Sequence, residues 1–438
     1  MSESVVKVGV LGCGNVGAAL VQLIEERGDE IAARTGIRLE VAKVAVRSLT
    51  RKRPIHLDES VLTREAAEVV ADPDIDVVVE AIGGIEPARE LILAALGSGK
   101  PVVTANKELL ANHGAELFKA ASAGEVDLLF EAAVAGGIPI LRPLRESLVG
   151  EDVRRIMGIV NGTTNFILTR MSEEGTSYAA ALTEAQQLGY AERDPTADVE
   201  GYDAGAKAAI LASIAFGAKV VAGDVYHEGI SNISATDIGF AARLGYVIKL
   251  LAVAELVSVE GDGPDEVAVR VHPAMVPVSH PLAGVRDSFN AVFVEGAAVG
   301  DLMFYGRGAG GAPTGSAVLG DLVDAAVNLR KGTHADLLAL TRRPIRPIDE
   351  LRSSYYVNLD VVDRPGVLRA VAEAFERHGV SIRSLEQEGV GEHARLIFIT
   401  HRAREADVQG TLDDLRGLDV IHDITSVLRV VGDDQDLT

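Results

Sequence analysis

Residues 7–17 read Lys7-Val8-Gly9-Val10-Leu11-Gly12-Cys13-Gly14-Asn15-Val16-Gly17. The apolar start predicts a buried strand, and apolar positions continuing through Ile24 predict a helix after the glycines. Gly12 permits a tight turn, Gly14 lets backbone approach a pyrophosphate, and Gly17 lets the helix pack on the strand. The helix N-terminus also favours phosphate charge. We therefore expect a dinucleotide site, against the alternative of a purely structural glycine turn.

Short apolar runs alternate with helical stretches through the rest of residues 1–152, which we expect to form the dinucleotide-binding domain. This alternation predicts an α/β fold with a Rossmann-type, doubly wound parallel sheet. The further strands are predicted at 39–46, 76–81, 101–104 and 127–132.

Basic residues follow the second predicted strand. Arg47 stands at its end, and Arg51, Lys52 and Arg53 come soon after. A protein specific for NAD more often has an acidic residue here for the ribose 2′-hydroxyl, and Glu40 lies too early in the strand for that role. A 2′-phosphate is the natural partner of the basic cluster, which predicts NADPH as cofactor with NADH possible. A solvated basic loop is the alternative.

The segment from Leu188 to Lys207 places several carboxylates ahead of one lysine. Asp203 and Lys207 are four residues apart and so share one helical face. The apolar run 208–212 that follows predicts that this face enters a buried helix. An ordinary acid–base helix pair is the competing interpretation, but the dinucleotide fingerprint at the N-terminus favours a substrate site.

Composition excludes several classes of protein. A chain of 438 residues predicts about three domains, at roughly 150 residues each. The formal net charge of −22 argues against nucleic acid, and the absence of a Lys/Arg-rich tail argues against an anionic membrane partner. The single cysteine, Cys13, cannot form an internal disulfide. The most apolar segment, 208–221, is too short to span a bilayer. We expect a cytoplasmic protein without a signal peptide.

The pattern changes after residue 152. A strand at 155–160, a polar turn at 161–165 and later strands at 249–257, 266–271 and 291–294 predict an α+β catalytic and dimerisation domain over 153–313. The glycine-rich segment 306–316 then leads into a helix from about 317 to 329. That segment is either a second close approach to the cofactor or a flexible crossing between domains. We expect the helix, as part of 314–330, to return to the first domain.

A third domain is predicted over 355–431, after a linker over 331–354. Strands at 356–361, 382–388, 395–400 and 424–431 alternate with helices at 367–378 and 405–416. This βαββαβ order predicts two helices on one face of an antiparallel sheet. Residues 432–438 form an acidic tail that we expect to be frayed.

Five segments together resemble homoserine dehydrogenase: the fingerprint, Thr104-Ala105-Asn106-Lys107, the run from Glu131 to Pro139, the run from Asn161 to Asn165, and the run from Gly189 to Lys207. The unit that contains the Asp-Arg-Pro-Gly turn at 363–366 resembles an ACT domain. The resemblance extends over essentially the whole chain. It implies reversible, nicotinamide-dependent reduction of L-aspartate 4-semialdehyde to L-homoserine, on the route to threonine and methionine.

The resemblance also implies residue roles. Lys207 resembles the general acid/base, Lys107 a second active-site lysine near nicotinamide and substrate, Glu192 and Asp203 substrate ligands, and Asp198 a supporting carboxylate. The cofactor-binding positions are Gly12, Gly14, Asn15, Val16, Gly17, Arg47, Thr104, Lys107, Gly189 and Gly306. A monovalent-cation site, for sodium, matches Glu131, Val134, Gly136 and Ile138, largely through backbone carbonyls.

The residue chemistry agrees with this activity. Hydride reduction of an aldehyde leaves an alkoxide, which a lysine ammonium in a closed site can stabilise and protonate. An amino-acid substrate also carries an α-ammonium, for which Glu192 and Asp203 supply carboxylates. Two alternatives stay open: a thiol-dependent dehydrogenase, for which Cys13 is poorly placed, and a non-catalytic sensor of nucleotide and amino acid, which needs neither lysine.

The third domain suggests regulation. Gly366, beside Asp363, lies where a missing Cβ lets backbone groups meet an amino acid at a helix N-terminus. In the ACT domains that it resembles, an amino acid binds near this turn, commonly between two units. We expect L-threonine as effector and a homodimer or homotetramer. A β-to-α turn that simply needs Pro-Gly geometry is the alternative.

Overall fold

The computed structural model describes residues 4–259, 261, 263–335, 340–389 and 394–432. Contacts divide the chain into two units, which are described in turn. The first unit comprises Met1–Val160, Ala206–Val225 and Phe289–Arg343. The second comprises Asn161–Gly205, Tyr226–Ser288 and Pro344–Thr438. Among the described residues, no helix is long and apolar enough to cross a membrane.

A six-stranded parallel sheet forms the first part of the first unit, in the order β3-β2-β1-β4-β5-β6. This order confirms the doubly wound fold and reverses direction between β1 and β4, where such sheets bind ligands at the carboxyl ends of the strands. The strands are β1 Ser4–Leu11, β2 Ile37–Ala45, β3 Leu62–Thr63, β4 Val77–Glu80, β5 Val102–Thr104 and β6 Leu128–Leu129. The helices are α1 Asn15–Thr35, α2 Ala66–Ala71, α3 Ala88–Gly97 and α4 Lys107–Gly124.

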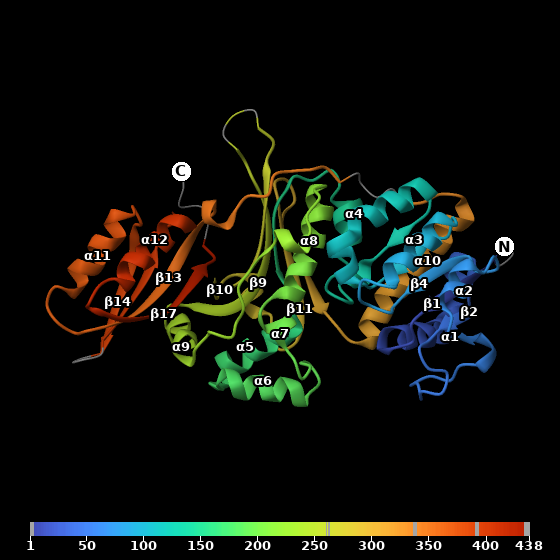
Figure 1. Ribbon diagram of the computed structural model, residues 1–438, viewed down its shortest axis with the longest axis horizontal. Coiled ribbons are helices and arrows are strands. Elements are labelled where there is room, and N and C mark those ends of the chain that lie inside the picture. The colour runs from blue at the N-terminus through green and yellow to red at the C-terminus, as the bar shows by residue number, and fades with distance from the viewer. Residues whose placement is uncertain (1–3, 260, 262, 336–339, 390–393, 433–438) are drawn as a thin grey trace. The chain divides into compact units, whose positions relative to one another are not determined.

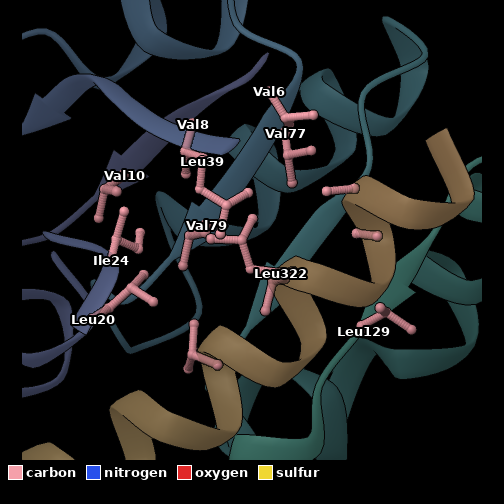
Figure 2. Close-up of a cluster of buried hydrophobic side chains, with 14 of the residues drawn as sticks. Val6, Val8, Val10, Leu20, Ile24, Leu39, Val77, Val79, Leu129 and Leu322 are labelled. Atoms are coloured by element: carbon pink, nitrogen blue, oxygen red, sulfur yellow. The ribbon is translucent and has the colours of Figure 1, made fainter. Parts of the chain in front are cut away.

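A late helix, α10 (Gly311–Lys331), completes the core of this sheet (Figure 2). Its buried positions Val318, Leu322 and Ala325 recur at helical spacing and pack with Leu20 and Ile24 of α1. The predicted start near residue 317 was wrong, because the helix begins at Gly311. The glycine-rich first turn is typical of a loop in sequence. In the structure Gly311 and Gly315 instead allow this turn to pack closely against α1.

Three antiparallel strands, in the order β12-β11-β7, also belong to the first unit. They are β7 Val153–Ile159, β11 Phe289–Gly296 and β12 Gly300–Arg307. The sequence analysis did not predict β12. Its side chains alternate between exposed and half-buried, so the strand lacks the apolar run that marks the buried strands.

The second unit contains the helices before and around the polar segment 188–207 (Figure 1). They are α5 Gly162–Glu174, α6 Tyr178–Gln187, α7 Thr196–Val199, the start of α8 Tyr202–Phe216, and α9 Ala235–Arg243. Two twelve-residue strands, β9 Tyr246–Val257 and β10 Glu266–Pro277, pair antiparallel along their whole length.

Strand β10 is twice as long as the predicted 266–271 and continues through Pro273. Its other edge pairs with β8 (Tyr226–His227) at Arg270 and Val271, and with β17 (Ile421–Val430) at Ala274 and Met275. The proline falls between those two short pairings, where the missing N–H is not required.

The C-terminal part of the second unit confirms the predicted βαββαβ order. Its antiparallel sheet runs β17-β13-β15-β14, with α11 and α12 on one face (Figure 1). Tyr355, Val357 and Leu359 face those helices, whereas Tyr356 and Asn358 contact Asp237 of α9 on the other face. The elements are β13 Arg352–Val361, α11 Val367–Arg377, β14 Ile382–Gly389, β15 Ala394–Thr400, β16 Ala403–Arg404, α12 Glu405–Arg416 and β17 Ile421–Val430.

Candidate active site

The fingerprint glycines occupy positions that other residues could not share without strain. Gly12 has φ +99°, its N–H donates to the carbonyl of Ala45 at 3.0 Å, and a Cβ there would lie 2.6 Å from the carbonyl oxygen of Ala81. A Cβ on Gly17 would lie 2.2 Å from the carbonyl oxygen of Gly12. Both glycines are therefore required by the backbone itself.

Gly14 differs, because a Cβ there would meet nothing within 4 Å. It is the N-cap of α1, and no side chain caps this helix end. Asn15 and Val16 open the helix. Uncapped N–H groups beside open space fit a dinucleotide pyrophosphate.

Arg47 lies exposed just beyond the end of β2. Its neighbour Arg53 has a local role, since its guanidinium donates to the carbonyls of Ser48, Leu49 and Arg51 and so closes the loop. Within the predicted basic cluster, Arg53 thus stabilises the loop, whereas Arg47 lies exposed at the carboxyl ends of the strands.

Lys107 begins α4, where a buried polar network fixes the backbone. The carboxylate of Glu80 accepts from Thr104 Oγ1 at 2.5 Å and from the backbone N–H of Ile82 at 2.7 Å. Thr104 Oγ1 in turn accepts from the N–H of Asn106, the N-cap of α4. A cation at a helix N-terminus opposes the helix dipole, so the position of Lys107 needs a role other than helix stability. Sequence reasoning missed Glu80, which reads as the end of an apolar strand.

The predicted cation segment forms a tight turn against the glycine-rich segment. Gly136 has φ +53°, and a Cβ there would lie 2.3 Å from the carbonyl oxygen of Gly308. Ile138 donates to the Ala135 carbonyl at 3.0 Å and lies against Gly306. The glycines at 306 and 308 are therefore closely packed and do not form a loose crossing between domains.

The Glu131 carboxylate is occupied by backbone groups. It accepts from the N–H groups of Ile140, Leu141 and Arg142. The Glu131 N–H donates to Asp321 at 2.8 Å, and burial together with the Glu131 charge raises the pKa of Asp321 to about 7. The cation site stays a prediction, and it would have to rest on backbone carbonyls such as those of Glu131 and Val134.

The carboxylates of the second unit share one amide. Asn161 donates from Nδ2 to Asp198 at 2.7 Å and to Asp203 at 2.9 Å, while its Oδ1 caps α5 by accepting from the Thr164 N–H. Thr163 Oγ1 also lies 3.3 Å from Asp198. Asn161 is thus fixed at one end by the helix and orients both acids at the other. The sequence marked the Asn-Gly-Thr-Thr turn without predicting this role.

Lys207 is buried, with 8% of its surface exposed, and its Nζ donates to the carbonyl of Val160 at 2.6 Å. Asp203 is equally buried one turn earlier in α8. Two other predicted residues lie in the loop before α7: Glu192 is exposed, and Gly189 adopts φ +78°. The structure thus buries the Asp203–Lys207 face, as the spacing predicted.

His227 lies close to the same helix. A Cβ on Gly205 would be 2.0 Å from His227 Nε2, and the His227 ring lies 5.1 Å from that of Tyr202. Its place in the sequence, 20 residues after Lys207, gave no signal for this contact.

The predicted effector turn is exposed. Gly366 has φ +95° and precedes α11 without a side-chain cap, and Asp363 is exposed beside it. A Cβ on Gly366 would meet nothing within 4 Å. The backbone angle therefore requires glycine, which agrees with the turn-geometry interpretation and leaves an uncapped helix end accessible.

The sequence matches three family profiles: homoserine dehydrogenase NAD-binding domain over residues 12–131, homoserine dehydrogenase over 139–323, and ACT domain over 355–420. The homoserine dehydrogenase of Corynebacterium glutamicum is 52% identical over 98% of this chain and 96% of its own. The crystal structure of a homoserine dehydrogenase from Thiobacillus denitrificans is 40% identical, with a TM-score of 0.91 over 98% and 99% of the two chains.

A hyperthermophilic archaeal homoserine dehydrogenase in complex with NADPH is 30% identical, with a TM-score of 0.63 over 74% of this chain and 98% of its own. No finding favours the thiol-dependent or non-catalytic alternatives, and burial raises the pKa of the Cys13 thiol, which leaves it a poorer nucleophile. The chain therefore belongs to the homoserine dehydrogenase family: it is a nicotinamide-dependent oxidoreductase that acts on the CH–OH group of homoserine and carries a C-terminal ACT domain.

Proposed function

We propose that Lys207 is the general acid/base of this homoserine dehydrogenase, with Asp203 and Glu192 as ligands of the substrate. The carrying observation is the buried ammonium of Lys207, one turn from the buried carboxylate of Asp203. A buried charged pair in a helix is costly unless it is used or compensated.

The bound nicotinamide supplies the hydride that reduces L-aspartate 4-semialdehyde to L-homoserine. As negative charge develops on the substrate oxygen, the Lys207 ammonium donates its proton to that oxygen; in the oxidation, the neutral amine takes the proton back. The Val160 carbonyl holds Nζ in place for this transfer. Asp203 and Glu192 bind the α-ammonium, and Asp198 supports Asp203 through their shared partner Asn161.

The cofactor is proposed to be NADPH, with NADH accepted less well. The open space beside Gly14 and the uncapped start of α1 support a pyrophosphate there. The exposed guanidinium of Arg47 suits a 2′-phosphate. Lys107 is the second active-site lysine. Further cofactor contacts are proposed at Gly12, Asn15, Val16, Gly17, Thr104, Gly189 and Gly306.

Sodium is the proposed cation at the 131–138 turn. A carbonyl oxygen has two lone pairs, so that of Glu131 can bind an ion besides accepting from the Val134 N–H. The carbonyls of Val134, Gly136 and Ile138 are the other proposed ligands. The sequence-based domain limits, 1–152 with 314–330, 153–313 and 355–431, are proposed as the functional divisions.

Regulation is proposed to act through the ACT domain. L-threonine would bind at Asp363 and Gly366, and two copies of the chain or four would form the enzyme. The cytoplasm is the proposed location. The one cysteine, half-buried Cys13, cannot form an internal disulfide, which is compatible with a reducing compartment.

Replacing Lys207 by alanine tests the proposal. Lys207→Ala should lower kcat by about 10²-fold or more, the scale of lost general acid/base catalysis, because proton transfer to the alkoxide is lost. NADPH binding, measured by fluorescence titration, should stay within about two-fold of the parent. The exposed Lys119 on α4 provides the control, and Lys119→Ala should leave kcat unchanged. Parental turnover in Lys207→Ala would overturn the assignment.

A further inference from the structure

Arg429 of β17 is the centre of a buried ionic network in the second unit. Its guanidinium donates to Glu405 at 2.9 and 3.1 Å and to Glu228 at 2.7 Å. Arg429 and Glu405 are 6% and 5% exposed, and the Tyr355 hydroxyl also donates to Glu405. Glu405 and Tyr355 belong to the same C-terminal domain as Arg429. Glu228 does not, since it follows β8 in the catalytic part of the chain.

The residues beside Glu228 contact the turn that joins Asp198 to Asp203. The Ile230 N–H donates to the Val199 carbonyl at 2.9 Å. Gly229 passes so close that a Cβ there would lie 2.5 Å from the same carbonyl oxygen. These contacts hold the end of α7 directly after Asp198.

The residue on the other side of Glu228 reaches the start of α8. His227 fills the space beside Gly205 and lies against Tyr202, the residue before Asp203. Segment 227–230 therefore touches the chain after Asp198 and on both sides of Asp203. This segment therefore packs directly against the chain that carries both carboxylates.

Strand β10 keeps the parts of this arrangement in register. It pairs with β8 at Arg270 and Val271 and with β17 at Ala274 and Met275. The Glu228 N–H also donates to the Val271 carbonyl at 2.8 Å. Arg429 and Glu228 thus meet across neighbouring strand ends, both paired with β10.

We propose that the Arg429–Glu228 ion pair is the contact through which the C-terminal domain holds the substrate-binding turn in position, with Glu228 as a positioning residue. The inference rests on the proposed substrate role of Asp203. It links the ACT domain to the substrate carboxylates through one charged contact. A rearrangement that moves Arg429 should therefore change the affinity for substrate more than the rate of the chemical step.

The exposed pair formed by Arg243 provides a matched control. Arg243 of α9 also reaches the C-terminal domain, where it meets Glu388 at 2.9 Å and Glu386 at 3.4 Å. That pair joins the same two parts of the chain but lies outside segment 227–230. Glu228→Gln and Arg243→Gln therefore each remove one charge from a contact between these two parts of the chain. Only Glu228 belongs to segment 227–230, which contacts the turn that joins Asp198 to Asp203.

The test combines kinetics with hydrogen exchange on the full-length chain. Glu228→Gln should raise the KM for L-homoserine about five-fold, because the ion pair with Arg429 becomes a weaker hydrogen bond from the guanidinium to a neutral amide. Its kcat and its KM for NADP⁺ should stay within about two-fold of the parent. Amide exchange in peptides covering 198–205 should quicken. Arg243→Gln should change none of these values. Glu228→Asp, which keeps the charge, should give a KM between those of the parent and Glu228→Gln.

Three results would overturn the inference: unchanged KM and exchange in Glu228→Gln, equal changes in Arg243→Gln, or a Glu228→Asp variant as defective as Glu228→Gln. Asp203→Asn separates this inference from the proposed function. A normal KM for homoserine in Asp203→Asn would remove the substrate role itself. A defective Asp203→Asn beside a normal Glu228→Gln would remove only the positioning role.

Discussion

The dinucleotide fingerprint is fixed by close backbone contacts, whereas hydrogen bonds from one side chain orient the substrate carboxylates. Gly12 and Gly17 are constrained by one another and by the ends of neighbouring strands, at Ala45 and Ala81. The carboxylates of Asp198 and Asp203 depend on Asn161, far earlier in the chain, and the turn between them is contacted by residues 227–230. Both sites need tertiary contacts, but the fingerprint is recognisable as a short glycine pattern, whereas no short pattern groups Asn161 and residues 227–230 with the carboxylates.

The largest expected difference lies within the fingerprint itself. Gly12→Ala should cost about 1 to 3 kcal/mol in free energy of unfolding, because it forces a Cβ onto a backbone oxygen at positive φ. Gly14→Ala should leave stability nearly unchanged, since its φ of −81° suits alanine and its Cβ meets nothing.

Gly14→Ala should nevertheless weaken NADPH binding, because the new methyl group occupies the space beside the uncapped helix end. Urea unfolding and NADPH titration of both variants separate the two effects. Equal destabilisation by the two substitutions would show that the glycines do not differ as the backbone angles indicate.

The same contrast explains what the sequence could predict. Periodicity and glycine spacing gave the parallel sheet and the βαββαβ unit, because both depend on local patterns. Strand β12 has no apolar run, and the first turn of α10 is rich in glycine, so both were missed. The contacts of His227 and Arg429 depend on tertiary pairing with β10, which no local pattern records. The spacing of Asp203 and Lys207 was informative because one helix carries both.

A second effect of similar size is expected at Arg47, which tests whether the first unit selects the cofactor. Arg47→Ala should weaken NADPH binding by about 1 to 3 kcal/mol, the range for a hydrogen bond to a charged group, and should barely change NADH binding. Arg34→Ala provides the control. Arg34 is exposed in the last turn of α1, at the end away from the fingerprint, so this variant should bind both cofactors as the parent does. Equal losses for both cofactors would instead give Arg47 a folding or general electrostatic role.

The smallest effect concerns a buried lysine of the second unit. Lys249 Nζ donates to Asn165 Oδ1 at 3.0 Å and to the Val285 carbonyl, and burial lowers its pKa to about 8. Between pH 8 and the ordinary value of 10.5, the unfolded chain binds more protons than the folded chain. This group therefore makes the protein more stable as pH rises through that window.

Lys249→Met should remove this dependence. The stability of the parent relative to Lys249→Met should rise by about 1 kcal/mol or more between pH 8 and pH 10, measured by urea unfolding. The exposed Lys331 of α10 is the control, since Lys331→Met should run parallel to the parent. A constant difference between parent and Lys249→Met across this range would contradict the shifted pKa.

We expect the turn that joins Asp198 to Asp203 to bind substrate independently of the dinucleotide fingerprint. Two constants measured for Asp203→Asn test this expectation: kcat/KM for L-homoserine and the Kd for NADPH. We expect kcat/KM to fall by about 10²-fold, because the substrate loses a charged contact and Lys207 loses the carboxylate one turn earlier in α8. The Kd for NADPH should stay at the parental value. Parental kcat/KM, or an equal loss in NADPH binding, would contradict it.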